Sequence, residues 1–185
     1  YYKYGNNIET TGDDQWKIFK QGVGNGNLPS NNVLSILRDK DNSIWVGTDD
    51  GIGIIYCSDN VLGNCEATLP IIQQDQFAGF LFKGEQVQSM AIDGANQKWI
   101  GTQNGLNVLN LKSGKVKTYS HQPGDPCSIA DNEIGNSIFK DRQGILWIAT
   151  GGKGFMRYDP VNDNFDTYSY PINITDVGER LERIN

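Results

Sequence analysis

Three copies of one short motif constrain the fold of this chain more than any other feature of its sequence. Each copy has an apolar run with a Ser, then an Asp four residues after that Ser and a Trp six residues after the Asp. A Thr follows three residues after the Trp. The Trp residues are 54 and then 48 residues apart. A period of this length indicates a repeat architecture, in which each unit packs against its neighbours.

We expect the shared positions of the motif to be scaffold rather than chemistry. The third copy departs from the other two by Ala149 in place of a Gly and by one additional residue between Ile134 and Asp141, which predicts a β-bulge. The expected scaffold residues are Asp39, Trp45, Gly47, Thr48 and Gly51 in the first copy, Asp93, Trp99, Gly101, Thr102 and Gly105 in the second, and Asp141, Trp147 and Thr150 in the third.

Each copy is predicted to form four antiparallel β-strands. The apolar runs that begin at Val33 and Val87 suit a buried inner strand, and Asp, Asn and Gly in the next segment suit a tight hairpin turn. β-branched residues around each Trp favour a second strand. Four antiparallel strands in 40–55 residues correspond to one propeller blade. The large Trp ring is expected to fill the wedge between neighbouring blades.

The sequence therefore predicts an all-β chain that forms about three blades of a β-propeller. Propellers commonly close with four to eight blades, and seven blades of about 50 residues need roughly 350 residues. We therefore expect the 185 residues to be one partial domain of a larger propeller of about seven blades. The predicted parts of this domain, 1–185, are an outer strand of a preceding blade at 16–19, blades at about 33–82, 87–119 and 134–168, and a tail or the start of a next blade at 171–185.

Two of the three cysteines lie close enough along the chain to form a local disulfide. Cys57 and Cys65 flank a polar segment that is expected to be a loop. A disulfide between them would place the chain outside the cytoplasm, whereas two free thiols would suit a cytosolic protein. Cys127 remains without a partner, in a Pro- and Gly-containing segment that is expected to be an exposed loop.

Composition excludes several classes of function. The chain has 16 Lys and Arg against 22 Asp and Glu, a net charge of −6, which argues against binding to nucleic acid. One His and three Cys leave too few ligands for a zinc site of the usual type. No apolar stretch approaches the roughly 20 residues of a membrane helix, so no insertion of this segment into a membrane is expected.

The motif resembles a known family of repeats. The segments 28–39 and 44–51 look like the two-component regulator propeller repeat, and so does the segment from His121 to Ile134. This resemblance implies a periplasmic sensor region of a hybrid two-component system in Bacteroidota. A second resemblance covers segments between Cys65 and Thr102, which look like the PorZ-like cell-surface propellers associated with type IX secretion. Both resemblances imply a β-propeller fold.

We therefore expect a non-enzymatic recognition module in the periplasm or at the cell surface. Its partner would be a glycan or surface polysaccharide, or another protein, besides the remaining blades of its own propeller. Sensor and secretion accessory both remain open, as does a purely structural scaffold. The aromatic residues that could stack on sugars, or equally pack at an interface or in the core, are Tyr1, Tyr2, Tyr4, Tyr56, Phe77 and Phe80.

An enzyme is the alternative of a different class. A propeller lyase or glycoside hydrolase could use His121 as a base, and hydrolysis needs a pair of carboxylates at a set separation. Asp39-x-Asp41-x-Ser43 looks like the start of a calcium loop, but Ile44 replaces the Gly that such a loop requires, so we expect a hairpin turn. We assign no catalytic, cofactor-binding or metal-ligating residue. The carboxylates considered are Asp13, Asp14, Asp49, Asp50, Asp75 and Glu85, all in polar segments.

Overall fold

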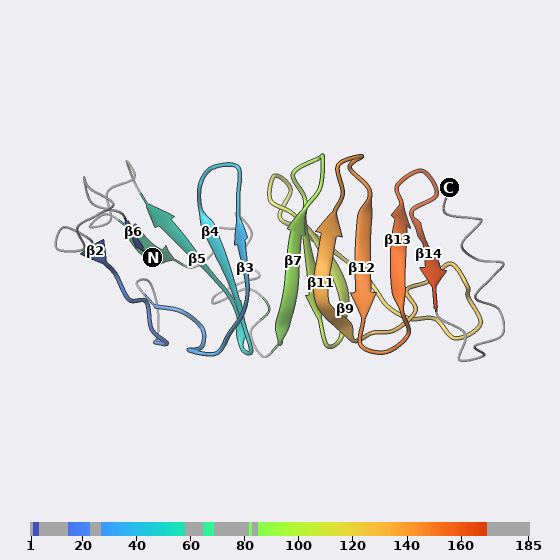
Figure 1. Ribbon diagram of the computed structural model, residues 1–185, viewed down its shortest axis with the longest axis horizontal. Coiled ribbons are helices and arrows are strands. Elements are labelled where there is room, and N and C mark those ends of the chain that lie inside the picture. Colours follow the sequence, from blue (N-terminus) through green and yellow to red (C-terminus); the bar gives the residue numbers. More distant parts are fainter. Residues whose placement is uncertain are drawn as a thin grey trace, which may run out of the picture.

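The computed structural model of the chain consists of β-strands arranged as three similar sheets. It describes residues 2–3, 15–22, 27–57, 65–68, 82 and 85–169. Each of the three sheets has four antiparallel strands, and a fourth sheet has two. These sheets confirm the prediction of an all-β chain with four-stranded antiparallel blades (Figure 1).

The strands of each blade follow one another along the chain from the inner to the outer edge. The two-stranded sheet pairs β1 (Tyr2–Lys3) with β2 (Gln15–Trp16). The first blade contains β3 (Val33–Arg38), β4 (Ile44–Thr48), β5 (Gly51–Cys57) and β6 (Cys65–Thr68). The second contains β7 (Val87–Ile92), β8 (Lys98–Thr102), β9 (Gly105–Asn110) and β10 (Lys115–Tyr119). The third contains β11 (Ile134–Lys140), β12 (Leu146–Thr150), β13 (Phe155–Asp159) and β14 (Asn164–Tyr168).

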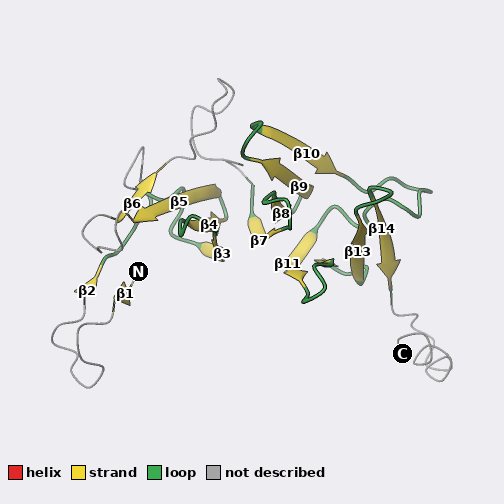
Figure 2. Ribbon diagram, turned by 90° about the horizontal axis from the view of Figure 1, so that it is seen from above, coloured by secondary structure: helices red, strands yellow, loops and turns green. Residues whose placement is uncertain are grey.

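The three blades fan out around their inner strands, as Figure 2 shows from above. β7 lies between β3 and β11 and contacts both. The outer strands β6, β10 and β14 point away from this centre (Figure 2). This arrangement is that of a β-propeller seen over part of its circle.

The hairpin turn after each inner strand depends on a residue with a left-handed backbone. Asn42 and Asn96 have φ angles of 67° and 64°, and Gly144 takes the same role in the third blade with 85°. Asn and Gly tolerate this conformation better than other residues. In each turn, the amide of the Asp at the end of the inner strand donates to the carbonyl that closes the turn. The turn chemistry of the sequence therefore sets where each inner hairpin ends.

The core lies between blades, where the Trp of one blade packs against the next. Trp45 and Trp99 are each 1% exposed. Trp45 packs with residues of the second blade such as Met90 and Ile100, and Trp99 with residues of the third blade such as Leu146. The Trp side chains therefore fill the wedges between adjacent blades.

The expectation of a buried inner strand holds for β7 and fails for β3. Ile36 of β3 is 68% exposed, whereas Met90, its register equivalent in β7, is buried. The reason is the missing neighbour: among the described residues, only the segment with Phe19 and Leu28 packs on this side of the first blade, where it covers Val46 and Ile55. The inner half of that face remains open.

The additional residue of the third copy lengthens a register shift that the inner strands of all three blades share. The register of β11 against β12 shifts between Ile134 and Ile138. The first and second blades have a shorter shift, between Val33 and Ser35 and between Val87 and Ser89. The additional residue is thus absorbed before the register resumes its common pattern.

Other predicted segments differ in extent or lie outside the described residues. The outer strand expected at 16–19 is β2, which covers Gln15–Trp16 and pairs with β1. β6 is the fourth strand of the first blade, and the residues on both sides of it, 58–64 and 69–81, are not among those described. The segment 171–185 is also outside them.

Candidate functional site

The repeated Asp residues in the second and third blades bind the repeated Trp. Trp99 Nε1 donates to Asp93 Oδ2 at 3.0 Å, and Trp147 Nε1 donates to Asp141 Oδ2 at 2.9 Å. The hydrogen bond from Trp147 lowers the pKa of Asp141 below its ordinary value. These carboxylates therefore hold the indole rings at the turn of each hairpin.

The first blade uses its Asp differently, because a lysine of the second blade reaches it. Lys98 is completely buried, and its Nζ lies 2.9 Å from Asp39 Oδ1 and 2.8 Å from Asp39 Oδ2. Trp45 Nε1 is buried and has no hydrogen-bond partner in the described chain. Lys98 Nζ also lies 5.7 Å from the centre of the Trp45 ring, within the range of a cation–π contact. This ion pair joins the first blade to the second.

The repeated Thr and Gly residues shape the turn between the second and third strands. Thr48 Oγ1 donates to the carbonyl of Gly51 at 2.9 Å, and Thr102 Oγ1 donates to that of Gly105 at 3.2 Å. Thr150 makes the same bond to Gly154 at 3.0 Å, across one more residue. Gly51 and Gly105 have φ angles of 106° and 136°, which a side chain would strain.

The Gly two residues after Trp45 and after Trp99 allows the next blade to approach closely. A Cβ atom on Gly47 would lie 2.7 Å from Val87 Cγ1, and one on Gly101 would lie 2.4 Å from Ile134 Cγ2. Both distances are too short for carbon atoms in contact. The residues that repeat thus bind one another or pack between blades.

One end of the blades carries polar turns whose side chains do not repeat. We call this surface the entry rim; it consists of the residues before each inner strand and the turns between second and third strands. Its side chains come from Asn32 and Asp49 in the first blade, Glu85, Gln86, Gln103 and Asn104 in the second, and Glu133 in the third. The turn from β8 to β9 and the start of β7 share the lower edge of the molecule in Figure 1.

Pairs on the entry rim join an amide to a carboxylate. Asn32 Nδ2 donates to Asp49 Oδ2 at 3.0 Å, and hydrogen bonds from Ser30 and Asn32 lower the pKa of Asp49. Asn104 Nδ2 donates to both carboxylate oxygens of Glu85, at 2.9 and 2.8 Å. In the third blade, the carbonyl of Glu133 accepts from the amide of Gly151, and the Glu133 side chain is exposed.

The residues considered for catalysis have separate partners. The exposed His121 lies in the connection from β10 to β11, with Nδ1 2.7 Å from the carbonyl of Ile129. Glu85 lies before β7 and accepts from Asn104. Among the described residues, no hydrogen bond or ion pair joins the side chains of His121 and Glu85. Asp13, Asp14 and Asp75 are outside the described residues.

The segment that looks like a calcium loop is a hairpin turn held by its own donors. Asp41 Oδ1 accepts from the amide and the hydroxyl of Ser43, at 2.9 and 2.6 Å, and Asp39 is bound to Lys98. In the part of the chain that the structure describes, no group of three or more His, Cys, Asp and Glu side chains could hold a metal ion.

A polar cluster closes the outer half of the interface between the second and third blades. Asp163 accepts hydrogen bonds from Lys117, Tyr119 and Tyr158. The bonds from Lys117 and Tyr119 lower the pKa of Asp163 to about 2. Burial, followed by the bond to Asp163, raises the pKa of Tyr119 to about 12, and burial also raises the pKa of Tyr158. Through these hydrogen bonds, the outer strand β10 is joined to the third blade.

The two cysteines of the predicted disulfide lie on adjacent strands of the first blade. Cys57 and Cys65 are direct partners in the register of β5 and β6. Opposite residues of antiparallel strands have Cα atoms about 4.5–5.5 Å apart, which lies within the range that a disulfide spans. Cys127 is a free and exposed thiol, as expected for its loop.

Sequence reasoning missed Lys98 and the entry-rim pairs. Lys98 stands at the repeat position of Ile44 and Leu146, so a charged residue where the other copies are aliphatic was the available signal. The entry-rim partners Glu85 and Asn104 are 19 residues apart, and the sequence offers no signal that joins them. Of the candidate stacking aromatics, Tyr2 lies in β1, and Tyr56 in β5 is 38% exposed, with a pKa that burial raises.

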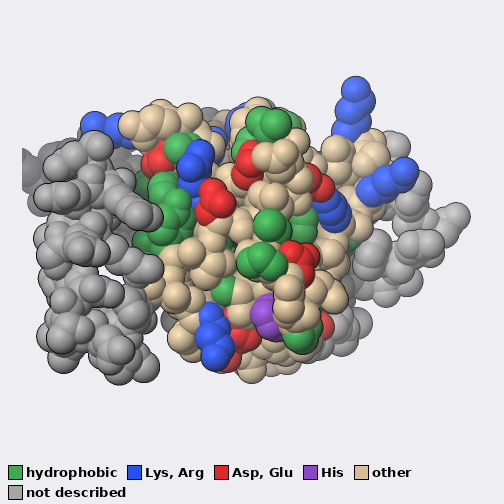
Figure 3. All heavy atoms as spheres, turned by 90° about the vertical axis from the view of Figure 1, so that its right-hand side faces the viewer, with side chains coloured by type: hydrophobic (Ala, Val, Ile, Leu, Met, Phe, Trp, Pro, Cys, Tyr) green, Lys and Arg blue, Asp and Glu red, His purple; other side chains and the backbone are tan. Residues whose placement is uncertain are grey.

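The exposed surface of the molecule is mixed in character. On the face that forms the right-hand side of the molecule in Figure 1, hydrophobic side chains lie between acidic and basic ones (Figure 3). Within the described ranges, no helix has the length and hydrophobicity to cross a membrane.

Comparison with known proteins identifies the repeat. The family model described as two component regulator propeller matches residues 27–50 and 128–152. These ranges cover the inner hairpins of the first and third blades, and the second blade has the same strand order. No curated protein matches the chain.

Solved structures share the fold at low sequence identity. The extracellular domain of BT3049 from B. thetaiotaomicron, described as a hybrid two component system, is 24% identical with a TM-score of 0.57, over 75% of this chain and 18% of that one. PorZ, a surface component of the type-IX secretion system of Porphyromonas gingivalis, is 23% identical with a TM-score of 0.63, over 84% of this chain and 21% of that one. Virginiamycin B lyase from Staphylococcus aureus is 17% identical with a TM-score of 0.50, over 80% of this chain and 45% of that one.

Identities of this size show a shared fold alone. The chain spans about a fifth of the length of the first two of these proteins. The matched repeats, the blade geometry and these structures agree with one another. The chain therefore forms blades of a β-propeller, and two of its segments match the two component regulator propeller repeat.

Proposed function

We propose that this chain is part of a non-catalytic recognition propeller that works outside the cytoplasm. The observation that carries the proposal is the division between repeated and non-repeated residues. The repeated Asp, Trp, Thr and Gly residues are used in contacts within and between blades. The entry rim, in contrast, carries a different set of polar side chains on each blade. Binding residues commonly lie on loops that a rigid scaffold positions.

The chemistry of the entry rim suits a polar, hydroxylated ligand. Amide and carboxylate side chains offer both donors and acceptors, which is what a sugar hydroxyl group needs. Asn32 and Asn104 are exposed, and each already holds one carboxylate in a fixed position. We therefore propose a glycan or surface polysaccharide as the ligand, with a polar surface of another protein as the alternative.

The extracytoplasmic setting has separate support. One structural neighbour is an extracellular domain and another is a surface component. The opposed register of Cys57 and Cys65 is compatible with a disulfide, which persists in oxidising compartments. A sensor region and a secretion accessory would both use the same entry rim.

A glycan and peptide array with matched variants tests the proposal. The double substitution Glu85→Gln with Asn104→Ala removes one entry-rim pair, and Lys112→Ala in the exposed β9–β10 turn is the control. We expect binding to a glycan that the double variant loses and the control keeps. Binding that both variants keep, or a ligand bound away from the entry rim, would contradict the proposal.

A further inference from the structure

The entry-rim turn of the third blade differs from those of the first two blades. After its repeated Thr, the first blade has Asp49, whose carboxylate accepts a hydrogen bond from the segment before β3. The second blade has Gln103 and Asn104, and both side chains bind the segment before β7. The third blade has Gly151 and Gly152 at these two positions. Its turn therefore sends no side chain from these positions to the segment before β11.

The side chain of Glu133 lies over the space that Gly151 leaves. The carbonyl of Glu133 accepts from the amide of Gly151 at 2.9 Å, which ties the segment before β11 to the turn. A Cβ atom on Gly151 would lie 2.7 Å from Glu133 Cδ and 2.9 Å from Glu133 Cγ, closer than carbon atoms in contact. The Glu133 side chain therefore occupies the place where a side chain at position 151 would begin.

Two charged side chains at this turn have no partner within the described residues. The Glu133 carboxylate is exposed and makes no hydrogen bond or ion pair there, whereas the carboxylate of Glu85 is held by Asn104. Lys153 follows the two glycines in a turn that is one residue longer than its equivalents. Its amide donates to Thr150 Oγ1 at 3.0 Å, and its ammonium group is exposed and forms no ion pair with the described residues. The third blade thus presents two opposite charges at one turn.

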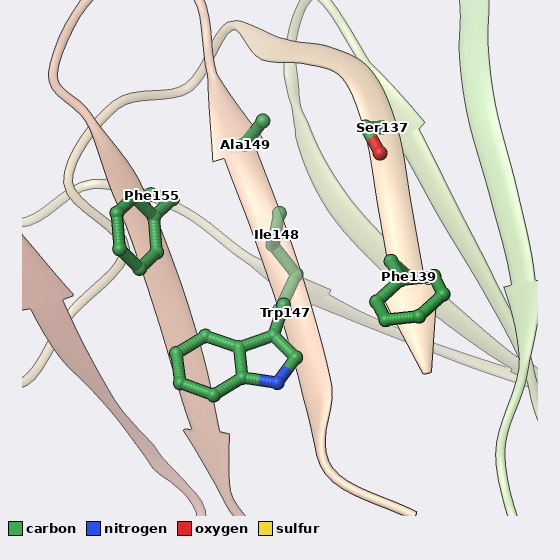
Figure 4. A pocket seen from close by; sticks show the side chains of 6 residues that line it. All are labelled: Ser137, Phe139, Trp147, Ile148, Ala149 and Phe155. Carbon is green, nitrogen blue, oxygen red and sulfur yellow. The ribbon is translucent and has the colours of Figure 1, made fainter. Parts of the chain in front are cut away.

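The apolar groove of the same blade does not include these charged residues. Phe155 lines that groove together with Phe139 and Trp147 (Figure 4). Ile52 and Leu106, at the repeat position of Phe155, are completely buried and pack within the cores between blades. The position of Phe155 is therefore one that the repeat uses for packing, whereas Glu133 and Lys153 belong to the polar end of the blade.

Sugar hydroxyl groups suit a carboxylate and an ammonium group at the same time. A hydroxyl both donates and accepts hydrogen bonds, so one of two adjacent hydroxyls donates to the carboxylate while the other accepts from the ammonium group. Hydrogen bonds of this kind, to an ionised group, are stronger than those between neutral groups. A uronic acid would bring a like charge to Glu133, and an amino sugar would bring one to Lys153. A sugar with neutral hydroxyl groups suits both side chains.

We propose that Glu133 and Lys153 determine the ligand specificity of the entry rim, and that they select a neutral sugar with two adjacent free hydroxyl groups. This inference rests on the proposed recognition function. The rim carboxylates of the first two blades, Asp49 and Glu85, are already bound by Asn side chains and shape the rim. The third blade supplies the charged contacts: Glu133 accepts from one hydroxyl of the sugar, and Lys153 donates to the adjacent one.

Binding of oligosaccharides to the full polypeptide that carries this sequence tests the inference. The probes are neutral oligosaccharides and matched ones that contain uronic acids or amino sugars, first on one array and then in isothermal titration calorimetry. We expect a neutral probe to bind. Glu133→Gln and Lys153→Met should each weaken that binding about 10- to 100-fold, because each removes a hydrogen bond to a charged group. Asp166→Asn in β14 and Lys112→Met in the β9–β10 turn, both exposed, are the matched controls and should leave the affinity unchanged.

A glycine substitution separates the position of the carboxylate from its charge. The Cβ atom of Gly151→Ala would displace the Glu133 side chain without removing its charge, so the affinity for the neutral probe is expected to fall. Gly94→Ala is the matched control, because its Cβ atom would meet no other atom within 4 Å. Unchanged affinity in Gly151→Ala would overturn the assigned position of the carboxylate.

The outcomes separate this inference from the proposed function on which it rests. Wild-type affinity in either Glu133→Gln or Lys153→Met, together with loss of binding in the double variant Glu85→Gln with Asn104→Ala, would overturn the inference and leave the recognition function standing. Stronger binding of a uronic acid or amino sugar probe than of its neutral counterpart would overturn the selection of a neutral sugar. Binding of none of the probes would contradict both the inference and the glycan ligand of the proposed function.

Discussion

The buried ion pair between the first and second blades leads to a prediction in which its two partners are not equivalent. Lys98 is completely buried, and both carboxylate oxygens of Asp39 lie within 2.9 Å of its Nζ. Removal of one partner from a buried pair typically costs about 3–5 kcal/mol, because the other charge loses its compensation. The actual cost depends on what the remaining partner can still bind.

Lys98 and Asp39 differ in the hydrogen bonds that each can make once the other has been removed. After Asp39→Ala, Lys98 keeps only two longer contacts with Asn96, at 3.4 and 3.3 Å, so we expect the full cost of about 3–5 kcal/mol. After Lys98→Leu, Asp39 keeps the amide of Lys40 at 2.6 Å and becomes free to accept from Trp45 Nε1, which has no hydrogen-bond partner among the described residues of the wild-type chain. A hydrogen bond to a charged group contributes about 1.5–3 kcal/mol, so we expect a net cost of about 1–2 kcal/mol.

Urea unfolding of the two single variants and the double variant measures this difference. Leu146 occupies the same repeat position in the third blade, so a Leu side chain is expected to pack at position 98. A loss of stability in Lys98→Leu would therefore report the loss of the ion pair rather than poor packing. In the same variant, the indole Nε1–H resonance of Trp45 is expected to move to lower field as the new bond forms. Lys98→Leu that destabilises as much as Asp39→Ala, with an unchanged Trp45 resonance, would refute the reasoning.

Four further predictions follow from the scaffold. Because hydrogen bonds hold the pKa of Asp163 at about 2, below the unfolded value of about 3.9, its stabilising effect is lost as pH falls from about 4 towards 2. Asp163→Asn should remove that part of the acid dependence of the urea midpoint, and an unchanged profile would contradict the assignment. Thr102→Val leaves buried partners unpaired and should cost about 1–3 kcal/mol in urea unfolding, more than Thr150→Val at the less buried site. Gly101→Ala should cost about 1–3 kcal/mol because its Cβ would lie 2.4 Å from Ile134, and a wild-type midpoint would show that the blades can move apart. Mass spectrometry under oxidising conditions should find Cys57 linked to Cys65 and Cys127 free, and three free thiols would exclude the disulfide.

The sequence predicted those features of the fold that all three copies of the repeat share. Trp45, Trp99 and Trp147 each lie six residues after an Asp and three residues before a Thr. This constant spacing predicted the blades and their all-β character, because a repeated packing position requires the large side chain at the same place in every copy. The additional residue before Asp141 corresponds to the longer register shift of β11. The hairpin turns were also predictable from local sequence, because Asn42 and Asn96 are of a residue type that tolerates their left-handed backbone.

Features that depend on which blades are neighbours were not predictable. Ile36 has the side chain of a core residue but lies on a face that the described residues leave open. Lys98 is buried only because Asp39 of another blade, 59 residues away, faces it. The entry-rim pair of Glu85 and Asn104 likewise depends on how two separate turns meet in space. Single-sequence patterns contain no information on such long-range contacts.

A polysaccharide turnover assay tests most directly the central claim that this propeller recognises its ligand without transforming it. The folded chain and its His121→Ala and Glu85→Gln variants would be incubated with a panel of polysaccharides, and new reducing ends and unsaturated products would be measured. The account predicts no product above the protein-free control for any of the three proteins. Product formation by the wild-type chain that either substitution abolishes would contradict it.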